Sequence, residues 1–585
     1  MKTQAPPSLL LFFLGIIMVV GTALPSFAAG GACPNGADYL NLSSPGDGGG
    51  QGSVTLSTLG VTSCYYIAAN GSDSNAGTSE SSPWLHAPGM PACSGSCAST
   101  TPSAGEGFIF RGGDTWHRNS GSPSLGGDWG WGQSGSSGNP IYIGVDTSWF
   151  SSSSFARPIV DEDNTITTSE PSSCRYPDDG ATLLNFSGQS NVILDAFEFR
   201  GACWSGGAGG MTINTGSFTV AERLYIHGWS VASSAADDNH DLISNSNGGG
   251  ANNKNRKLFL VIDGEDSTFG AACDSPSCVG SFGGSGGATG WAIGDCWDVE
   301  YSVIRHASQG MECGDAGIIH DNLMEYLFEP SFGGRHGNVF EVIPGGLGEL
   351  CSNFIAYNNV TRNTNEGVNW WIQCPNFYIF NNVWANSGHY PPDPNGLMLS
   401  PPGASGSSVV KAYIYNNTFQ ANKAQAGPSN SSTPGWGSGS SVTFANNHIM
   451  DFTSTSGFFS CGSGDTCSMS DKGGEVFQTT AAANAQGYVL ANDYAPTSAS
   501  GATVNAGINA AAFCASVPDA AAAASCPLGS SGGVVEQSGW GGKIAASAGL
   551  TMNVRTGGWD AGAYEFGSGT SSAPAPPTGL AATVQ

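Results

Sequence analysis

The chain has 585 residues, of which 45 are acidic and 18 are basic, so its formal net charge at pH 7 is −27. This charge argues against nucleic acid as a partner, because nucleic-acid binding depends on basic side chains that neutralise phosphates. An anionic polymer would need a bridging cation. Glycine contributes 87 residues, and charged residues make up 11% of the chain, against about 25% in ordinary domains. Such a composition favours short stacked strands joined by many turns.

The first residues have the pattern of an export signal. Lys2 precedes an apolar run from Leu9 to Val20, and small residues then surround the bond after Ala28. A basic start, an apolar centre and a small-residue exit are typical of a cleaved secretory signal. We therefore expect residues 1–28 to be removed and the protein to be secreted, free or held at the cell surface. No other run reaches the roughly 18 apolar residues of a membrane span.

Sixteen cysteines in an exported chain predict a disulfide-rich fold. Proximity in the sequence suggests eight bridges: Cys33–Cys64, Cys93–Cys97, Cys174–Cys203, Cys273–Cys278, Cys296–Cys313, Cys351–Cys374, Cys461–Cys467 and Cys514–Cys526.

Three segments resemble parts of secreted β-helix proteins. Residues 64–78 (CYYIAANGSDSNAGT), followed by Pro83 and Trp84, resemble the motif with which many of those chains begin their fold. Residues 107–116 (GFIFRGGDTW) are similar to the strand that opens their first coil, and residues 560–566 (DAGAYEF) are similar to their closing strand. The resemblance implies architecture and leaves the chemistry open.

These markers divide the chain into five parts. After the signal we expect an N-terminal cap segment, a parallel β-helix, a group of C-terminal coils with a cap, and a Ser/Pro-rich tail. Their predicted limits are 29–105, 106–453, 454–566 and 567–585.

A short apolar run followed by a polar pair recurs through the central part of the chain. The pairs are Asp321-Asn322, Asn358-Asn359, Asn381-Asn382, Asn416-Asn417 and Asn446-Asn447, with looser versions at Asp195-Ala196-Phe197, His227-Gly228-Trp229 and Tyr301-Ser302-Val303. Self-similarity at about 20 to 50 residues is typical of a solenoid, since one strand–turn unit buries its apolar face only by stacking on the next. Asn tolerates a left-handed turn, and its amide can bond the same amide one coil away. We therefore predict an all-β, right-handed parallel β-helix with an internal ladder of Asn322, Asn359, Asn382, Asn417 and Asn447.

One strand of each coil, usually opening after a glycine, is expected to carry the chemistry. Side chains on a strand alternate between core and solvent, and stacked strands lie about 4.8 Å apart. This spacing places Asp241, Glu312, Glu341, Asn369 and Trp371 on one outer face. Acids beside an aromatic surface suit a sugar, which has hydroxyls on its edges and apolar faces. A solvated face of an acidic protein explains the same pattern about equally well.

The densest acidic group is Asp237, Asp238 and Asp241. Oxygen ligands from one strand and its turn are what a hard cation such as calcium needs. The group resembles the D-D-x-x-D row of a group of calcium-dependent pectate lyases. The resemblance implies that calcium bound here would hold a uronate while a Lys or Arg removes a proton before β-elimination.

The chain departs from that pattern at two positions. Thr212 stands where the family has another Asp, and Glu312 stands where the family has its catalytic Lys. Lys254 and Lys257 are the nearest lysines, and either could act as the base only if the loop after the acidic row folds back.

Glycoside hydrolysis is the second enzymatic interpretation. It needs two carboxyl groups, about 5 Å apart for retention or roughly 6.5 to 9.5 Å apart for inversion. Asp241 with Glu312, or Glu312 with Glu341, are the candidate pairs. His336 is a further acid–base candidate, although it lacks the G-H-G and R-x-K context of the β-helix galacturonases and a turn residue would look the same.

A non-catalytic interpretation stays open beside these two. Long solenoids also serve as adhesins or carbohydrate-binding rods, for which exposed Trp131, Trp149, Trp370 and Trp371 would suffice. We predict a secreted, monomeric protein that binds a polysaccharide, with lyase or hydrolase activity favoured over an adhesin-like rod.

Overall fold

The computed structural model describes most of the chain with several gaps. The described residues are 30–34, 39–40, 53–164, 173–178, 180–205, 210–231, 240–245, 254–264, 291–294, 297–307, 309–312, 317–327, 339–342, 352–364, 370–386, 395–400, 409–420, 423–426, 436–461, 467–548, 550 and 552–567. The predicted export signal and most of the Ser/Pro-rich tail lie outside them.

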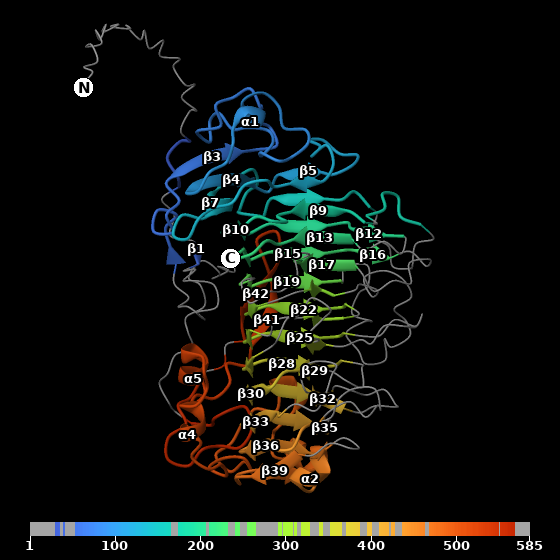
Figure 1. Ribbon diagram of the computed structural model, residues 1–585, viewed down its shortest axis with the longest axis vertical. Coiled ribbons are helices and arrows are strands. Elements are labelled where there is room, and N and C mark those ends of the chain that lie inside the picture. Colours follow the sequence, from blue (N-terminus) through green and yellow to red (C-terminus); the bar gives the residue numbers. More distant parts are fainter. Residues whose placement is uncertain are drawn as a thin grey trace, which may run out of the picture.

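Three long parallel sheets form the body of the protein (Figure 1). β10 (Val192–Asp195), β11 (Glu198–Arg200) and β13 (Gly210–Asn214) follow one another along the chain and belong to the 13-, 12- and 11-stranded sheets respectively. The next coil repeats this order and pairs in parallel with the one before. The strand order confirms the predicted all-β parallel β-helix, with the right-handed connections that parallel strands almost always take.

The 13-stranded sheet contains, besides β10, β3 (Ser63–Ile67), β4 (Glu106–Gly112), β7 (Ile141–Phe150), β14 (Val220–Glu222), β18 (Arg256–Leu258), β21 (Asp298–Glu300), β24 (Ile318–His320), β27 (Phe354–Tyr357), β30 (Asn376–Phe380), β33 (Lys411–Tyr415), β36 (Ser440–Ala445) and β39 (Cys467–Asp471). The 12-stranded sheet contains, besides β11, β5 (Thr115–His117), β8 (Ile159–Asp161), β15 (Tyr225–His227), β19 (Val261–Asp263), β22 (Val303–Arg305), β25 (Leu323–Glu325), β28 (Val360–Arg362), β31 (Val383–Ala385), β34 (Thr418–Gln420), β37 (His448–Met450) and β40 (Val476–Gln478).

The 11-stranded sheet contains, besides β13, β6 (Trp129–Gly130), β9 (Thr182–Asn185), β17 (His240–Ser244), β20 (Ile293–Gly294), β23 (Met311–Glu312), β26 (Phe340–Val342), β29 (Trp370–Gln373), β32 (Asn395–Ser400), β35 (Lys423–Ala426) and β38 (Phe459–Cys461). Shorter elements are β1 (Tyr39–Leu40) with β2 (Ser53–Val54), β12 (Cys203–Trp204) with β16 (Ser230–Val231), β41 (Val534–Gly539) with β42 (Gly542–Ser547), and the helices α1 (Gly95–Ser99), α2 (Thr455–Phe458), α3 (Thr480–Ala485), α4 (Ala511–Cys514) and α5 (Ala520–Ser525), plus a 3₁₀ turn at Leu490–Asn492.

The predicted Asn ladder joins consecutive coils inside the stack. Asn322 Nδ2 donates to Asn359 Oδ1 at 3.0 Å, and Asn359 Nδ2 donates to Asn382 Oδ1 at 2.9 Å. The same bond continues to Asn417 at 3.1 Å and to Asn447 at 3.2 Å. All five side chains are fully buried. The ladder is confirmed, and each rung supplies a partner for a buried amide of the next.

The residue before each rung takes the left-handed backbone that the pattern predicted. Its φ is 56° at Asp321, and it lies between 54° and 59° at the four asparagines that precede the other rungs. One upstream assignment is wrong. His227-Gly228-Trp229 follows β15 on the 12-stranded sheet, whereas the turn equivalent to the ladder contains Arg223, with φ 54°. Several of the described coils make two left-handed corners, for example at Asp321 and Tyr326 and at Asn358 and Asn363, so the two looked alike in the sequence.

Four of the predicted disulfides are present: Cys33–Cys64, Cys93–Cys97, Cys174–Cys203 and Cys514–Cys526. Each of the other four pairs includes a side chain outside the described residues, although Cys374 and Cys467 are both disulfide-bonded. The confirmed bridges close loops at the two ends of the fold and beside β12.

After β40 the chain turns back along the outside of the stack, as the red segment in Figure 1 shows. We call residues 479–567 the return segment. Arg157 donates to Lys543 O at 2.8 Å, and Asn381 donates to Leu528 O at 2.9 Å. β42 also contacts β15 and β19. The return segment therefore ties together coils that are far apart along the stack.

A network of buried ion pairs lies on the outer side of the 13-stranded sheet. Arg256 pairs with Asp298 at 3.1 Å and with Glu300, and His320 pairs with Glu300 at 3.1 Å and with Asp321 at 2.7 Å. The two carboxylates raise the pKa of His320 from 6.5 to about 10, against the opposing effect of burial. The imidazolium is thus part of the fold at neutral pH.

We predict that Asn382→Ala lowers the free energy of unfolding by about 1 to 3 kcal/mol, because its neighbours on both coils lose buried partners. Urea denaturation followed by circular dichroism measures this change. Asn376→Ala is the matched control, because Asn376 lies at the start of β30 and its Nδ2 bonds an exposed carbonyl. Equal effects of the two substitutions would contradict the stabilising role of the ladder.

We predict that protonation of His320 makes stability depend on pH. Since its folded pKa, about 10, lies above its unfolded value of 6.5, its contribution is fully present below pH 6.5 and is lost as pH rises through about 10. His320→Gln should flatten the fall in melting temperature between pH 6.5 and 10. An unchanged pH profile in the variant would show that His320 is neutral in the folded state.

Candidate functional site

The 11-stranded sheet aligns two glutamates on its outer face. Glu312 of β23 stands opposite Glu341 of β26, and Glu341 stands opposite Trp371 of β29. Met311 and Phe340, one position earlier on these strands, are fully buried in the core, so the glutamates point to the other side of the sheet. Glu312 is half-buried, and Glu341 is buried. The predicted pair Glu312–Glu341 is therefore in register on neighbouring coils.

Asp241 is not in register with Glu312 and Glu341, but its side chain extends toward their row on the 11-stranded sheet. The register runs from Ile243 through Ile293 to Met311, so the residue of β17 in the glutamate row is Ser244, three positions after Asp241. A methyl group built on Gly294 would stand 2.6 Å from Asp241 Oδ2 and 2.5 Å from Ser244 Oγ. Both oxygens therefore converge over this glycine.

Gly294 explains how the acids come together. It is opposite Glu312 in the sheet, and its lack of a side chain leaves room for the Asp241 carboxylate on the outer face. Asp241 Oδ1 also accepts a hydrogen bond from Trp291 N at 3.2 Å, which fixes the side chain across β20. The Asp241 carboxylate and the Ser244 hydroxyl thus lie over the strand that pairs with the strand of Glu312. A glycine between two predicted acids was visible in the sequence, but its meaning depends on the register.

Several predicted residues lie outside the described part of the chain. These are Asp237, Asp238, His336 and Asn369. The backbone of Trp371 is described and its side chain is not. The calcium row, His336 and the aromatic surface therefore remain predictions.

The two lysines after the acidic row occupy different places. Lys257 lies on β18 between Ala221 and Val299, and all three side chains are fully buried. Its Nζ donates to Asn255 Oδ1 at 2.6 Å. Lys257 is thus not presented on the outer face, whereas Lys254 Nζ lies 5.6 Å from the centre of the Trp297 ring.

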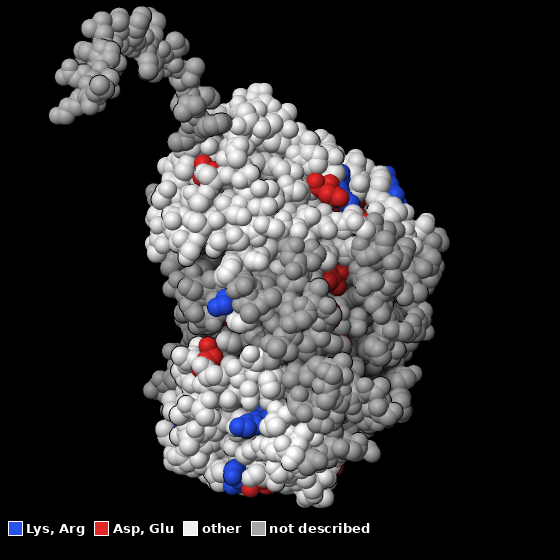
Figure 2. Space-filling model, viewed as in Figure 1, with Lys and Arg blue, Asp and Glu red and all other residues white. Residues whose placement is uncertain are grey.

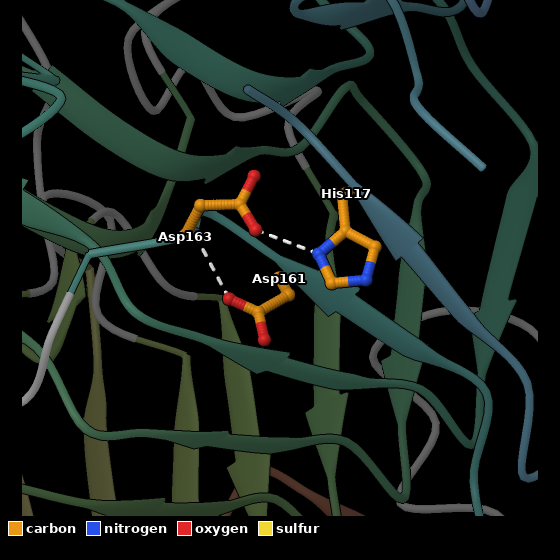
Figure 3. A group of neighbouring side chains, drawn as sticks. All are labelled: His117, Asp161 and Asp163. Carbon is orange, nitrogen blue, oxygen red and sulfur yellow. Dashed lines mark hydrogen bonds and ion pairs between the residues drawn. The ribbon is translucent and has the colours of Figure 1, made fainter. Parts of the chain in front are cut away.

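A second cluster with ligand-type atoms lies at the start of the 12-stranded sheet (Figure 3). His117 Nδ1 bonds Asp163 Oδ1 at 2.6 Å, and Asp163 N donates to Asp161 Oδ1 at 2.8 Å. The other carboxylate oxygens accept from Arg200 and from the backbone of Asn119. Each carboxylate oxygen already has a protein donor, so the cluster is explained as a hydrogen-bonded corner between β5 and β8.

Arg118 gathers three acids beside this corner. It pairs with Asp128 at 2.6 Å, with Glu162 at 3.2 Å and with Asp178. Burial raises the pKa of Glu162 to about 7, although Arg118 opposes the shift. Figure 2 shows acidic and basic atoms close together near the end of the molecule where β5 lies, on a face with few other charges. The Asp161-Glu162-Asp163 run could have indicated this cluster from the sequence.

Two of the four tryptophans proposed for a carbohydrate-binding rod are less exposed than expected, and the side chains of the other two, Trp370 and Trp371, lie outside the described residues. Trp131 is 3% exposed and packs against Phe108 and Trp129. Trp149 is half-buried against Tyr66. The expectation of an exposed Trp131 is wrong, because its side chain, directly after β6, joins that of Trp129 in the hydrophobic core of the first coils.

Several solved structures of carbohydrate-active proteins are similar to this chain. The pectate lyase Pel9A has 14% identity and a TM-score of 0.35, with 86% of this chain and 96% of that chain covered. The GH136 lacto-N-biosidase from Eubacterium ramulus has 9% identity and a TM-score of 0.31, with 71% and 68% covered. The PL6 family alginate lyase AlyGC has 11% identity and a TM-score of 0.30, with 64% and 49% covered.

At these TM-scores the likeness carries no argument about activity, and the fold rests on the strand pairing itself. No protein-family model and no curated protein matches the chain. Among the helices of the described residues, none has the length and apolar character needed to cross a membrane.

Proposed function

We propose that the protein cleaves a glycosidic bond of a polysaccharide on the outer face of the 11-stranded sheet, with Asp241, Glu312 and Glu341 as the reacting carboxyl groups. The observation that carries this proposal is the alignment of Glu312 with Glu341 on neighbouring strands, together with the convergence of Asp241 Oδ2 over Gly294. A secreted polysaccharide-degrading enzyme accounts for the predicted export signal as well.

The geometry suits acid–base chemistry. Carboxyl groups held close together repel each other when both are ionised, so one of them retains its proton more readily. The protonated group can donate to the glycosidic oxygen while the other attacks the sugar or activates water. Neighbouring strands about 4.8 Å apart favour Glu312 and Glu341 as a retaining pair, for which about 5 Å is needed.

The row that contains Glu312 and Glu341 continues with polar residues on other coils, as the binding of a polymer would require. Asn185 of β9 stands opposite Asn214 of β13 in the same register, and Asn214 Nδ2 donates to Asn185 Oδ1 at 3.1 Å. Asn214 in turn stands opposite Ser244. Polar side chains thus continue the row on successive coils, with Asn185 half-buried and Asn214 and Ser244 buried.

Calcium-assisted uronate cleavage is the second candidate, and one observation favours it. Asp241 Oδ2 and Ser244 Oγ converge on one point, and oxygen ligands of this kind suit calcium. Asp237 and Asp238 are the further predicted ligands. In this reading calcium would bind the substrate carboxylate, and the base would have to be a group other than the buried Lys257.

We predict that Glu312→Gln and Glu341→Gln each lower the rate of polysaccharide cleavage by about 10² to 10⁴-fold, since each removes a proton-transfer group. The assay incubates the mature protein with neutral and uronate polysaccharides, and measures reducing ends and absorbance near 235 nm for unsaturated products. Glu80→Gln, at an exposed position of the segment between β3 and α1, is the control. Full activity in both row variants would refute the proposed site.

Gly294→Ala tests the convergence of the acids directly. The added methyl would collide with Asp241 Oδ2, so we predict a loss of activity as large as that of Asp241→Asn, with an unchanged circular dichroism spectrum. Gly130→Ala is the matched control, because Gly130 lies in the same row and a methyl there meets nothing within 4 Å. Equal activity of the two glycine variants would contradict the convergence.

Calcium separates the two candidate reactions. If Asp237, Asp238 and Asp241 bind calcium, the ion should raise the melting temperature of the mature protein, because it binds only the folded state. Asp238→Asn with Asp241→Asn should abolish this shift. Cleavage that persists in EDTA, with no calcium-dependent shift at millimolar concentration, would leave the calcium-free hydrolase as the mechanism.

A further inference from the structure

Three side chains with metal-ligand atoms converge on the outer side of the 13-stranded sheet, a different sheet from the one proposed for cleavage. Asp298 and Glu300 lie two positions apart on β21, and His320 of β24 stands opposite Glu300. Val299 and Ile319, which precede Glu300 and His320, are fully buried in the core, so the three side chains point to the outer side. One ligand atom from each side chain lies within 4.8 Å of the other two. The three groups are therefore close enough to share one ion.

Two buried atoms of this group have no hydrogen-bond partner among the described residues. They are Oδ1 of Asp298, whose side chain is fully buried, and Nε2 of His320, which is 3% exposed. His320 Nε2 lies 3.1 Å from Glu300 Oε2, but the contact does not have the geometry of a hydrogen bond. An N–H group that donated to Glu300 would point at its oxygen. The two atoms instead lie side by side, as two ligands of one ion do.

The other polar atoms of the three side chains are held by neighbouring residues. Arg256 donates to Asp298 Oδ2 at 3.1 Å and to Glu300 Oε1. His320 Nδ1 bonds Asp321 Oδ2 at 2.7 Å. A carboxylate bonded to the second ring nitrogen is typical of metal-binding histidines, because it fixes the ring and its tautomer. With a proton on Nδ1, Nε2 keeps a lone pair for a ligand.

The charges of this cluster favour a divalent cation. Asp298, Glu300 and Asp321 are three acids that face one arginine, Arg256, and one histidine, His320. In the metal-free protein, whose pH dependence is predicted above, the proton on His320 supplies the second positive charge, and the five groups keep one negative charge in excess. A divalent ion that displaces this proton makes the cluster neutral, which removes the cost of burying the excess charge.

We propose that Asp298, Glu300 and His320 form a buried zinc site, with water as the fourth ligand. Zinc binds imidazole nitrogen and carboxylate oxygen at about 2.0 to 2.2 Å in a tetrahedron, which places ligand atoms about 3 to 3.6 Å apart. The distance of 3.1 Å between Glu300 Oε2 and His320 Nε2 fits this spacing. Calcium is disfavoured, because it takes oxygen ligands. On binding, His320 Nε2 releases its proton to solvent, and its lone pair and the two carboxylate oxygens form the bonds to zinc.

The burial of the site determines when the ion can enter. All three side chains are buried, so a folded molecule offers zinc no open path. Asp321, which supports His320, also accepts a hydrogen bond from Ser531 of the return segment. Zinc would therefore bind during folding, before the return segment docks, and would exchange slowly afterwards. The ion would join β21 to β24 beneath that contact, so its binding energy would add to the folding energy of these coils.

The test measures the metal content of the untagged mature protein, secreted by cells grown with added zinc chloride. Mass spectrometry should find about one zinc ion per chain, and EDTA should remove it only after urea has unfolded the protein. Asp298→Asn should lower the zinc content to less than about a tenth, because a charged ligand is lost. His306→Gln is the matched control and should keep the zinc. His306 is also buried and bonds Asp263 at 2.6 Å, but no third ligand group joins this pair in the described residues.

X-ray absorption of the zinc-loaded wild-type protein decides the matter even if Asp298→Asn fails to fold. The spectrum should show nitrogen and oxygen ligands with one imidazole. Sulfur ligands, zinc that EDTA strips from the folded protein, zinc retained in Asp298→Asn, or no zinc in the wild-type protein would each overturn the proposal. The site does not depend on the proposed cleavage, so Glu312→Gln should keep its zinc even where it abolishes activity.

Discussion

The structure depends on hydrogen bonds that each coil can complete only with its neighbours. The amide of Asn382 donates to Asn417 Oδ1 and to two backbone carbonyls, while its oxygen accepts from Asn359. None of these partners is exposed to water, so a missing coil would leave buried polar groups unpaired. This requirement fixes the spacing and register of the coils, and every other feature of the surface follows from that register.

The register of the parallel strands brings residues that are far apart in the sequence into one candidate site. On parallel strands, equivalent side chains of successive coils face the same side about 4.8 Å apart, so Glu312 and Glu341 meet although 28 residues separate them in the chain. The same register puts Gly294 where the Asp241 carboxylate needs room. A rigid stack can therefore hold several carboxyl groups together whose mutual repulsion would otherwise drive them apart.

The return segment converts a linear stack into a more cooperative unit. Neighbour-only contacts make a solenoid stable by the sum of its coils, but Arg157, Asn381 and Arg555 bond residues far away in the sequence. Charges are also buried between neighbouring coils of the stack itself, as in the pairing of Arg256 with Asp298 and Glu300. Removing only one partner of such a buried ion pair lowers the free energy of unfolding strongly, because the other charge is left buried and unpaired.

The sequence by itself determined the solenoid, the ladder and the four observed disulfides, because turn chemistry and cysteine spacing are local signals. It also placed Glu312 and Glu341 on one face by strand alternation. Only the tertiary structure decided that Lys257 points into the core and that His227-Gly228 belongs to the other corner of its coil, because both corners need the same left-handed backbone. The convergence over Gly294 and the meeting of Asp298 and Glu300 with His320 were equally out of reach, because both depend on the register between coils.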